Sequence, residues 1–319
     1  MSWNSGTQGT GQANALYTTI TSYMTGWSFV ETVSAADAGT TADCKVWRAP
    51  NDDWYLIFEP DNTNNRIRVY ASKQYTPAPT YRVKRYIPAT ASNTAYTPKA
   101  DYSYDNTNQT IGTGAYAQLT VSGTGFNWWV GVGPGNGSVS DLIYVGSDAG
   151  SYPSAFMAGF FTPTVGVDFP LFLWASGNNA ANAKWPNAGG IGGTVRFSHE
   201  YGLTASETGA FCGTIGFLPL SSSQDAFGSL YTSYRNRYIT DGIYVFDALI
   251  HGVTSGGIRQ GLRGYLPGFK VAAVDSGGSV RIGDTVTAGG ITYFVAGVAS
   301  TGAHSNLVMA LLIDTSAAF

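Results

Sequence analysis

Apolar and polar positions in this chain alternate mostly in short runs that predict β-strands, after a single helical stretch near the N-terminus. Leu16, Ile20 and Met24 recur at steps of four, which indicates an amphipathic helix, and Gly26 stands where a glycine would end it. From Trp27 onward, turn residues separate short apolar or alternating runs, as is typical of antiparallel strands. The pattern therefore predicts a mainly β fold of antiparallel β-sandwich or barrel-like modules, with one short N-terminal helix.

The predicted strands fall into an N-terminal half and a C-terminal half. In the N-terminal half they cover residues 27–33, 45–48, 53–59, 66–70, 116–121, 126–133, 141–146, 155–162 and 169–174. In the C-terminal half they cover residues 194–200, 210–218, 243–251, 268–275, 279–286, 291–298 and 306–313. Glycine-bearing turns at Gly277-Gly278, Gly289-Gly290 and Thr301-Gly302 separate the last four, which predicts a compact four-strand meander or small barrel.

A stretch rich in Gly, Ala and Asn, residues 178–193, indicates a boundary between two modules. We expect residues 1–175 to form the helix and a first β module. Residues 176–319 are expected to form a second β module that ends in the meander. The first fourteen residues are rich in Gly, Thr, Asn and Gln, which predicts a tail that is loose or ordered only by a partner.

Residues 76–110, called the Tyr/Pro segment below, differ in composition from the strands on either side. Prolines are spaced along the segment and aliphatic residues are few, so it favours extended backbone and cannot bury a core of its own. We expect an extended arm that lies on a neighbouring subunit, with a mobile excursion between strands as the alternative. The residues predicted to contact that subunit are Tyr75, Tyr81, Arg82, Arg85, Tyr86 and the terminal Phe319. For the basic residues of this set, an acidic neighbouring subunit is favoured over DNA.

Charged residues make up only 12% of the 319 residues, about half of the usual share in a soluble domain. Since charge stays mostly on surfaces that face water, this composition indicates a subunit that buries much of its surface against other protein. The alternative is a surface that carries Ser, Thr and Asn in place of ionic side chains. The net charge of −3 argues against nucleic acid as a partner. No apolar run in the sequence is long enough to cross a bilayer, and the N-terminus lacks the basic and apolar regions of a secretory signal.

The sequence contains no arrangement of residues that is typical of a catalytic or metal site. His199, His251 and His304 are too far apart along the chain for a metal pair, and no Gly-x-Ser-x-Gly motif occurs. Cys44 and Cys212 lack CxxC spacing and are predicted to be buried thiols of a protein made in a reducing cytoplasm, with a native disulfide as the alternative. We therefore expect a protein that is not an enzyme and that uses no cofactor, metal or small-molecule substrate.

Particular residues are compatible with two other functions. Trp54, Trp128 and Trp129 could offer ring faces to a glycan or another partner. Neighbouring residues in a strand point to opposite faces, however. One ring of each aromatic pair, Trp54-Tyr55 and Trp128-Trp129, is therefore expected in the core. A polysaccharide depolymerase would need two carboxylates across a groove, and the candidates are Glu31, Asp52, Asp53, Glu59, Glu200 and Glu207.

Several stretches near the two ends of the chain carry a resemblance to a known class of protein. They are Trp27-Ser-Phe-Val30, Val46-Trp-Arg-Ala-Pro50, Asp53-Trp-Tyr-Leu-Ile57, Arg66-Ile-Arg-Val-Tyr70, Gly261-Leu-Arg-Gly-Tyr-Leu-Pro-Gly268, Gly283-Asp-Thr-Val286 and Ile291-Thr-Tyr-Phe294. Together with the short helix that precedes them, they resemble structural proteins of tailed-bacteriophage virions from the tail and the head–tail junction. The resemblance implies a virion building block that forms a symmetric homo-oligomer.

Pattern, composition and resemblance together predict a non-enzymatic structural subunit of a phage virion, in the tail, baseplate or head–tail neck. We expect it to assemble with copies of itself and with other virion proteins through charge-poor surfaces and extended arms. The expected location is the virion, after synthesis in the host bacterial cytoplasm and without membrane association. A receptor- or glycan-binding module of a tail fibre or capsid decoration is the alternative, and a polysaccharide depolymerase is the third candidate.

Overall fold

Antiparallel sheets make up most of the structure, which is a computed structural model of residues 1–319. This architecture confirms the mainly β fold with one short N-terminal helix that the sequence predicts. The residues that the structure describes are 2–9, 12–51, 54–84, 110–112, 116–133, 141–149, 153–163, 171–177, 196–197, 208–212, 245–253, 259–275, 282–300 and 307–314. Within these residues no sheet closes into a barrel, and neither helix has the length and apolar character needed to span a membrane.

Three sheets contain nearly all of the described strands. The N-terminal sheet consists, in order across the sheet, of β2 (Ser28–Val33), β3 (Cys44–Arg48), β4 (Tyr55–Asp61), β5 (Arg66–Ser72) and β8 (Ala117–Thr120). The central sheet consists of β1 (Ser2–Gln8), β9 (Phe126–Gly133), β10 (Leu142–Ser147), β11 (Ser154–Phe160), β13 (Leu171–Gly177) and β14 (Arg196–Phe197). The C-terminal sheet consists of β15 (Thr208–Cys212), β16 (Val245–Val253), β17 (Arg259–Asp275), β20 (Leu307–Asp314), β19 (Ile291–Ser300) and β18 (Thr285–Ala288), with β12 (Thr162–Pro163) paired to β17.

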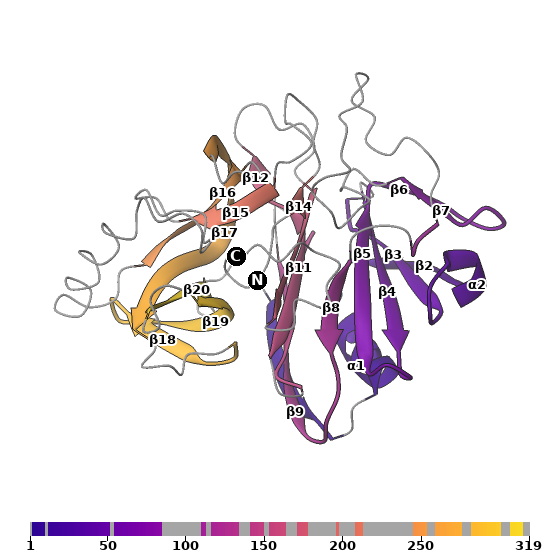
Figure 1. The fold of residues 1–319 in the computed structure, drawn as a ribbon, viewed down its shortest axis with the longest axis horizontal. Coiled ribbons are helices and arrows are strands. Elements are labelled where there is room, and N and C mark those ends of the chain that lie inside the picture. Colours follow the sequence, from indigo (N-terminus) through magenta and orange to yellow (C-terminus); the bar gives the residue numbers. More distant parts are fainter. Residues whose placement is uncertain are drawn as a thin grey trace.

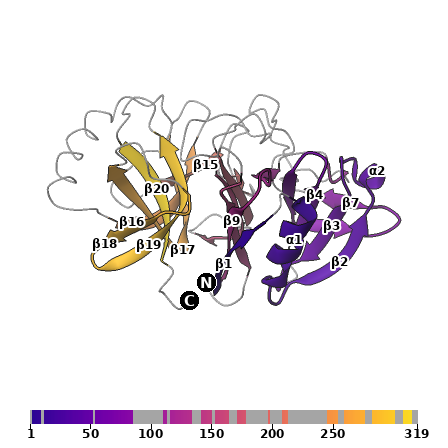
Figure 2. The same cartoon turned by 90° about the horizontal axis from the view of Figure 1, so that it is seen from below.

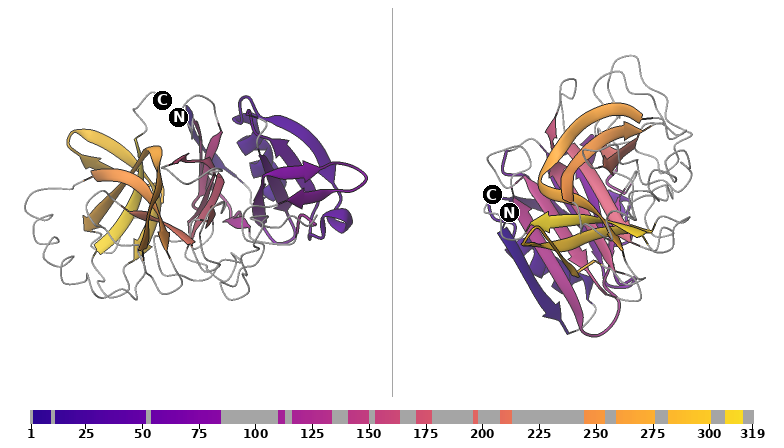
Figure 3. Two further views of the ribbon diagram at one scale, coloured as in Figure 1. Left: turned by 90° about the horizontal axis from the view of Figure 1, so that it is seen from above. Right: turned by 90° about the vertical axis from the view of Figure 1, so that its left-hand side faces the viewer.

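The central sheet lies between the other two sheets and is covered on both faces (Figures 1 and 3). All residues of β10 and β11 are buried, so neither strand shows the alternation of a half-exposed strand. On one face, Val130 and Phe156 share a core cluster with Phe58 of the N-terminal sheet. On the other face, the Tyr144 hydroxyl donates a hydrogen bond to the carbonyl of Ala296 in β19, at 3.0 Å. The described chain is therefore built in three packed layers.

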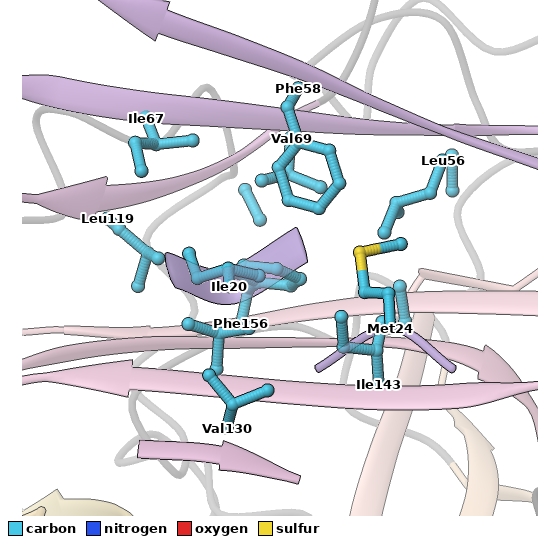
Figure 4. Packing of buried hydrophobic residues seen from close by; sticks show 14 of the residues in the cluster. Ile20, Met24, Leu56, Phe58, Ile67, Val69, Leu119, Val130, Ile143 and Phe156 are labelled. Carbon is cyan, nitrogen blue, oxygen red and sulfur yellow. The ribbon is translucent and has the colours of Figure 1, made fainter. Parts of the chain in front are cut away.

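Helix α1 (Ala13–Ser22) closes the core between the N-terminal and central sheets. Leu16 and Ile20 are fully buried on it, and Met24, just after the helix, is nearly so. Figure 4 shows Ile20 and Met24 between side chains of the two sheets. The helix contains no charged residue and its N-cap makes no side-chain hydrogen bond, so packing of its apolar face stabilises it. The predicted helix is confirmed, although Gly26 lies in the turn that follows, with a φ of 86°, and not at the helix end.

Strand β1 shows that the predicted loose N-terminal tail is wrong. Residues 2–8 pair with β9 over the whole strand, ending with Gln8 opposite Phe126. Their sequence shows no apolar alternation, since backbone hydrogen bonds hold most of this edge strand and side-chain burial contributes little. Trp3 is the exception, because its ring lies 4.5 Å from the ring of Phe294.

The C-terminal sheet differs from the predicted four-strand meander in its strand order. β18, β19 and β20 follow one another across the sheet as a meander, but β17 pairs with β20 and β16 instead of β18. Sequence patterns report local structure, and this neighbour relation is non-local. The predicted turn at Gly289-Gly290 is confirmed, because both glycines have the positive φ that a two-residue hairpin between β18 and β19 favours, 57° and 81°.

Two strand pairs cross the predicted module boundary between residues 175 and 176. β12 of the first module pairs with β17 of the second, and β14 of the second extends the central sheet beside β13. β13 itself ends at Gly177, close to the boundary. The division into 1–175 and 176–319 stays a prediction, and these two pairs connect its halves.

The start of the Tyr/Pro segment is a hairpin, where the sequence predicts an extended arm. β6 (Gln74–Thr76) pairs with β7 (Arg82–Lys84). Tyr75 and Val83 of this hairpin are buried in a second core, on the face of the N-terminal sheet turned away from the central sheet. These two buried side chains anchor the hairpin to the sheet. The overall composition of the segment, which is poor in aliphatic residues, does not indicate this anchor. Residues 85–109 of the segment lie outside the described residues.

A second helix, α2 (Ala35–Ala38), also covers this second core and is absent from the sequence prediction. Its signals are local: the Ser34 side chain accepts a hydrogen bond from the backbone N–H of Asp37, and Gly39 ends the helix in the left-handed conformation. Four residues are too few to produce a helical apolar period, so the pattern alone could not reveal it.

Candidate functional site

Glu59 is the more deeply buried of the two carboxylates proposed for a depolymerase that the structure describes, Glu59 and Glu31. It is fully buried on β4, and its oxygens accept hydrogen bonds from the N–H and hydroxyl of Thr41, at 2.9 and 2.7 Å, and from the N–H of Ala42 at 3.3 Å. The Tyr70 hydroxyl donates at 2.7 Å, and the Arg68 guanidinium lies at 3.4 Å. This geometry ties β4, β5 and the loop after α2 together, so Glu59 has a structural use.

Asp61 lies two residues further along β4, beside Glu59. It accepts hydrogen bonds from the backbone and side chain of Asn64, at 3.0 and 2.6 Å, and from the Thr41 hydroxyl at 2.9 Å, and it pairs with Arg66 at 3.2 Å. Burial opposes ionisation of the carboxyl, but these hydrogen bonds and the charge of Arg66 outweigh it and hold the pKa of Asp61 below its ordinary value. We call Glu59, Asp61, Thr41 and their two arginine partners the carboxylate network.

Glu31 holds the small hairpin of β6 and β7 against the N-terminal sheet. One of its oxygens accepts hydrogen bonds from the Tyr75 hydroxyl at 2.8 Å and from the N–H of Ala78 at 3.2 Å. Burial and the hydrogen bond to the Glu31 carboxylate both raise the pKa of Tyr75 well above its usual range. The other four carboxylates proposed for a depolymerase, Asp52, Asp53, Glu200 and Glu207, lie outside the described residues.

The residues predicted to contact a neighbouring subunit are placed only in part. Tyr75 is 9% exposed and packs against Tyr55, so its ring serves the second core of its own chain. Tyr81 and Arg82 are partly exposed, and Arg82 donates a hydrogen bond to the backbone carbonyl of Tyr81 at 3.3 Å. For these two residues the subunit contact stays a prediction. Arg85, Tyr86 and Phe319 lie outside the described residues.

The tryptophans considered for glycan binding are packed within the chain. Trp54 is fully buried, with the ring of Trp27 at 5.0 Å in an edge-to-face arrangement. Trp128 is 7% exposed and faces the core shared with the N-terminal sheet, while Trp129 faces the C-terminal sheet and contacts Phe294 at 5.4 Å. Trp54 and Trp128 therefore have no ring face open to a sugar, which corrects their candidacy for glycan contact.

Of the candidate cysteine and histidine positions, the structure describes the side chain of Cys44, and for two others only the strand in which they lie. Cys44 is fully buried in β3, 3.6 Å from the Thr40 hydroxyl, as predicted for a buried thiol. His251 and Cys212 lie in β16 and β15, and His199 and His304 fall outside the described residues. Among the residues that the structure describes, no group of three or more His, Cys, Asp or Glu side chains is placed to hold a metal ion.

Exposed apolar side chains are a feature of the structure that the sequence pattern does not reveal. Four large ones are exposed among the described residues: Phe29 at 50%, Tyr265 at 43%, Ile291 at 40% and Val30 at 38%. Phe29 and Val30 are consecutive and lie in β2, at the border of the N-terminal sheet. The sequence predicts a half-buried strand at 27–33, and only the strand order reveals that β2 is an edge strand with both residues uncovered.

Aromatic groups connect Phe29 to the core behind it. The ring of Phe29 lies 5.5 Å from the ring of Trp47, whose indole N–H donates to the Tyr17 hydroxyl at 2.9 Å. The Tyr17 ring in turn lies 5.6 Å from the buried ring of Phe58. Phe29 is therefore held on a packed support while half of it faces solvent.

A search of protein-family models and a search of curated proteins both find no match to this chain.

Proposed function

We propose that the chain is a non-enzymatic structural subunit of a bacteriophage virion, in the tail, baseplate or head–tail neck, which assembles with copies of itself. The observation that carries the self-assembly is the exposed pair Phe29 and Val30 on edge strand β2, called the β2 patch below. The stretches that resemble virion proteins support the location, and one of them contains the β2 patch.

The β2 patch has the properties of an interface centre. Aromatic side chains in well-packed surroundings dominate the binding energy of many interfaces, and charged residues are depleted there. Phe29 stands on Trp47, and its neighbours Ser28 and Val30 carry no charge. Glu31, the first charged residue along β2, is already engaged by Tyr75.

A bulge in β2 favours contact through side chains over the addition of a strand. The register between β2 and β3 shifts between Phe29 and Glu31, which leaves Val30 as the extra residue. Bulges at a sheet border interrupt the regular ladder that an added strand would need. We therefore expect a neighbouring subunit to cover the two apolar side chains without extending the sheet.

Replacing Phe29 by Asp tests the proposal. An aromatic side chain buries roughly 150–250 Å² when fully covered, so covering the exposed half of Phe29 removes about 100 Å² from water. At about 25 cal/mol per Å² this contributes about 2.5 kcal/mol per contact, and Phe29→Asp would weaken each contact roughly 70-fold. We expect light scattering coupled to size-exclusion chromatography to show oligomers for the native chain and monomers for the variant.

Ile291→Asp is the matched control, because Ile291 is 40% exposed but lies in β19 of the C-terminal sheet. It should leave assembly intact, and both variants should keep the far-UV circular dichroism of the native chain, since both side chains are exposed. A native chain that stays monomeric at all concentrations contradicts self-assembly. Loss of assembly in both variants contradicts the role of the β2 patch. Mass spectrometry of purified phage particles tests the location, and particles that lack the chain would refute it.

A further inference from the structure

We propose that strand β1 is exchanged between neighbouring subunits, so that β1 of one copy pairs with β9 of the next. The proposal rests on the proposed self-assembly and adds a second contact, distinct from the β2 patch. Three features of the described residues support it: the composition of β1, the fit of β9 to that strand, and the way the strand is connected to the rest of the chain.

The first feature is that β1 is polar and still fully paired. Of the residues Ser2–Gln8, Trp3 alone is a large apolar side chain. Opposite side chains of paired strands share a face, so Gly6 lies on the side of Trp128 and contributes no apolar atom beyond its backbone to the core there. A strand of this composition stays soluble when it leaves its sheet, which an exchangeable segment requires.

The second feature is that the border of β9 fits this particular strand. A Cβ atom added to Gly6 would lie 2.6 Å from Cζ2 of Trp128, so the indole ring occupies space that only a glycine leaves open. The Thr7 hydroxyl lies 3.1 Å from the side-chain oxygen of Asn127, and the Trp3 ring packs 5.7 Å from that of Tyr144. β9 is thus a binding site for the segment Ser2–Gln8, and every subunit carries both the segment and the site.

The third feature is that the strand is connected by a short glycine-containing link to a helix that is anchored independently. Residues 9–12, Gly-Thr-Gly-Gln, join β1 to α1, and no atom lies within 4 Å of a Cβ added to Gly9. The helix is held by its own buried residues and by the N–H of Asn14, which donates to the side-chain oxygen of Asn62 at 3.0 Å. Release of β1 therefore leaves α1 anchored in the core between the N-terminal and central sheets.

Exchange costs little in contacts, because β1 makes the same ladder and the same side-chain contacts with β9 of a neighbour. Figure 2 shows β1 beside β9, with α1 nearby. Gln8 and Ala13 are separated by five Cα–Cα steps, which span at most about 18 Å when extended. The β9 border of the accepting subunit must therefore come within about that distance of the start of α1, which limits the ways in which two copies can be arranged.

Cross-linking of mixed single-cysteine chains, in which Cys44 and Cys212 are replaced by Ala, tests the exchange. Thr7 and Asn127 are opposite one another, are both exposed, and are brought together only by pairing of β1 with β9. Thr7→Cys chains and Asn127→Cys chains are unfolded together, refolded, allowed to assemble, and treated with a short bis-maleimide linker. Exchange predicts a covalent dimer in the mixture, and none above background in either variant alone.

The double variant, with Thr7→Cys and Asn127→Cys in one chain, is the positive control for the reagent. Diluted to the monomer, it should form the link within one chain, seen as faster migration in a denaturing gel. Oligomers of the mixture without covalent dimers would overturn the exchange and leave self-assembly standing. A mixture that stays monomeric by light scattering would overturn both proposals.

Discussion

Replacing Glu59 by Gln is expected to destabilise the fold strongly, although Gln has nearly the same shape. The carboxylate is fully buried and accepts hydrogen bonds at both oxygens from Thr41, Ala42 and Tyr70, with Arg68 as its charged partner. An amide has one acceptor oxygen and no charge. The variant thus presents N–H groups where Glu59 accepts hydrogen bonds, and it leaves Arg68 without its counter-charge.

The size of the effect follows from the burial of the pair. Removal of one partner of a buried ion pair costs about 3–5 kcal/mol, because the remaining charge stays buried without compensation. The Arg68 side chain is 16% exposed, and its guanidinium also lies 4.7 Å from the centre of the Tyr116 ring. In the variant, solvent and the Tyr116 ring therefore still stabilise part of the positive charge. We therefore expect Glu59→Gln to lower the free energy of unfolding by about 3 kcal/mol, the low end of the range.

Urea unfolding followed by circular dichroism measures this loss, and Asp247→Asn supplies the matched control. Asp247 pairs with Lys270 at the surface, where the two side chains are 56% and 33% exposed, and such pairs contribute about 0–1 kcal/mol. Arg68→Met and the Glu59→Gln/Arg68→Met double variant complete the set. The double variant should lose less than the sum of the single variants. A Glu59→Gln variant as stable as Asp247→Asn, or strictly additive losses, would refute the account of the carboxylate network.

Two further predictions concern the carboxylate network and a close backbone contact. The pKa of Asp61 is held below its ordinary value of 3.8, so the ionised carboxylate contributes stability that is complete above that value and lost as the pH falls toward the folded-state pKa. Between pH 7 and pH 3 the urea midpoint of the native chain should therefore fall further than that of Asp61→Asn; equal falls would contradict this. Gly159→Ala should destabilise the fold far more than Gly125→Ala, as measured by thermal unfolding. Both glycines have positive φ, but a Cβ on Gly159 would lie 2.2 Å from the Asp141 carbonyl oxygen, whereas Gly125 faces open space; similar losses would contradict the steric argument.

Sequence reasoning located most strands because local patterns report local structure. Residues 126–133 were predicted as a strand and form β9 with the same bounds, since aromatic and branched residues there favour a pleated, buried surface. The pair Gly289-Gly290 predicts a turn because it separates two β-rich runs, and the positive φ of both glycines confirms it. The strand order of the C-terminal sheet could not be predicted from local patterns, because β17 and β20 are neighbours in the sheet but far apart in the sequence.

The candidate site was harder to predict, because exposure depends on neighbours far away in sequence. Phe29 and Trp54 are both aromatic residues in or beside predicted strands, yet one is half exposed and the other fully buried. The difference arises because β2 lies at the border of its sheet, whereas Trp54 packs against Trp27 and Phe160. The polar sequence of β1 likewise conceals a strand whose pairing comes from its backbone.

The structure weakens the inference from the low charge of the chain to assembly with other subunits. From composition alone, few charges indicate surfaces buried against other subunits. The central sheet supplies part of the explanation within one chain, because β10 and β11 are buried along their whole length and have no face on which charge would be useful. A three-layer chain needs fewer charged side chains than a two-layer chain of equal length. Composition therefore does not by itself imply assembly. The case for assembly rests on two particular places, the exposed β2 patch and the polar strand β1, where substitutions can decide it.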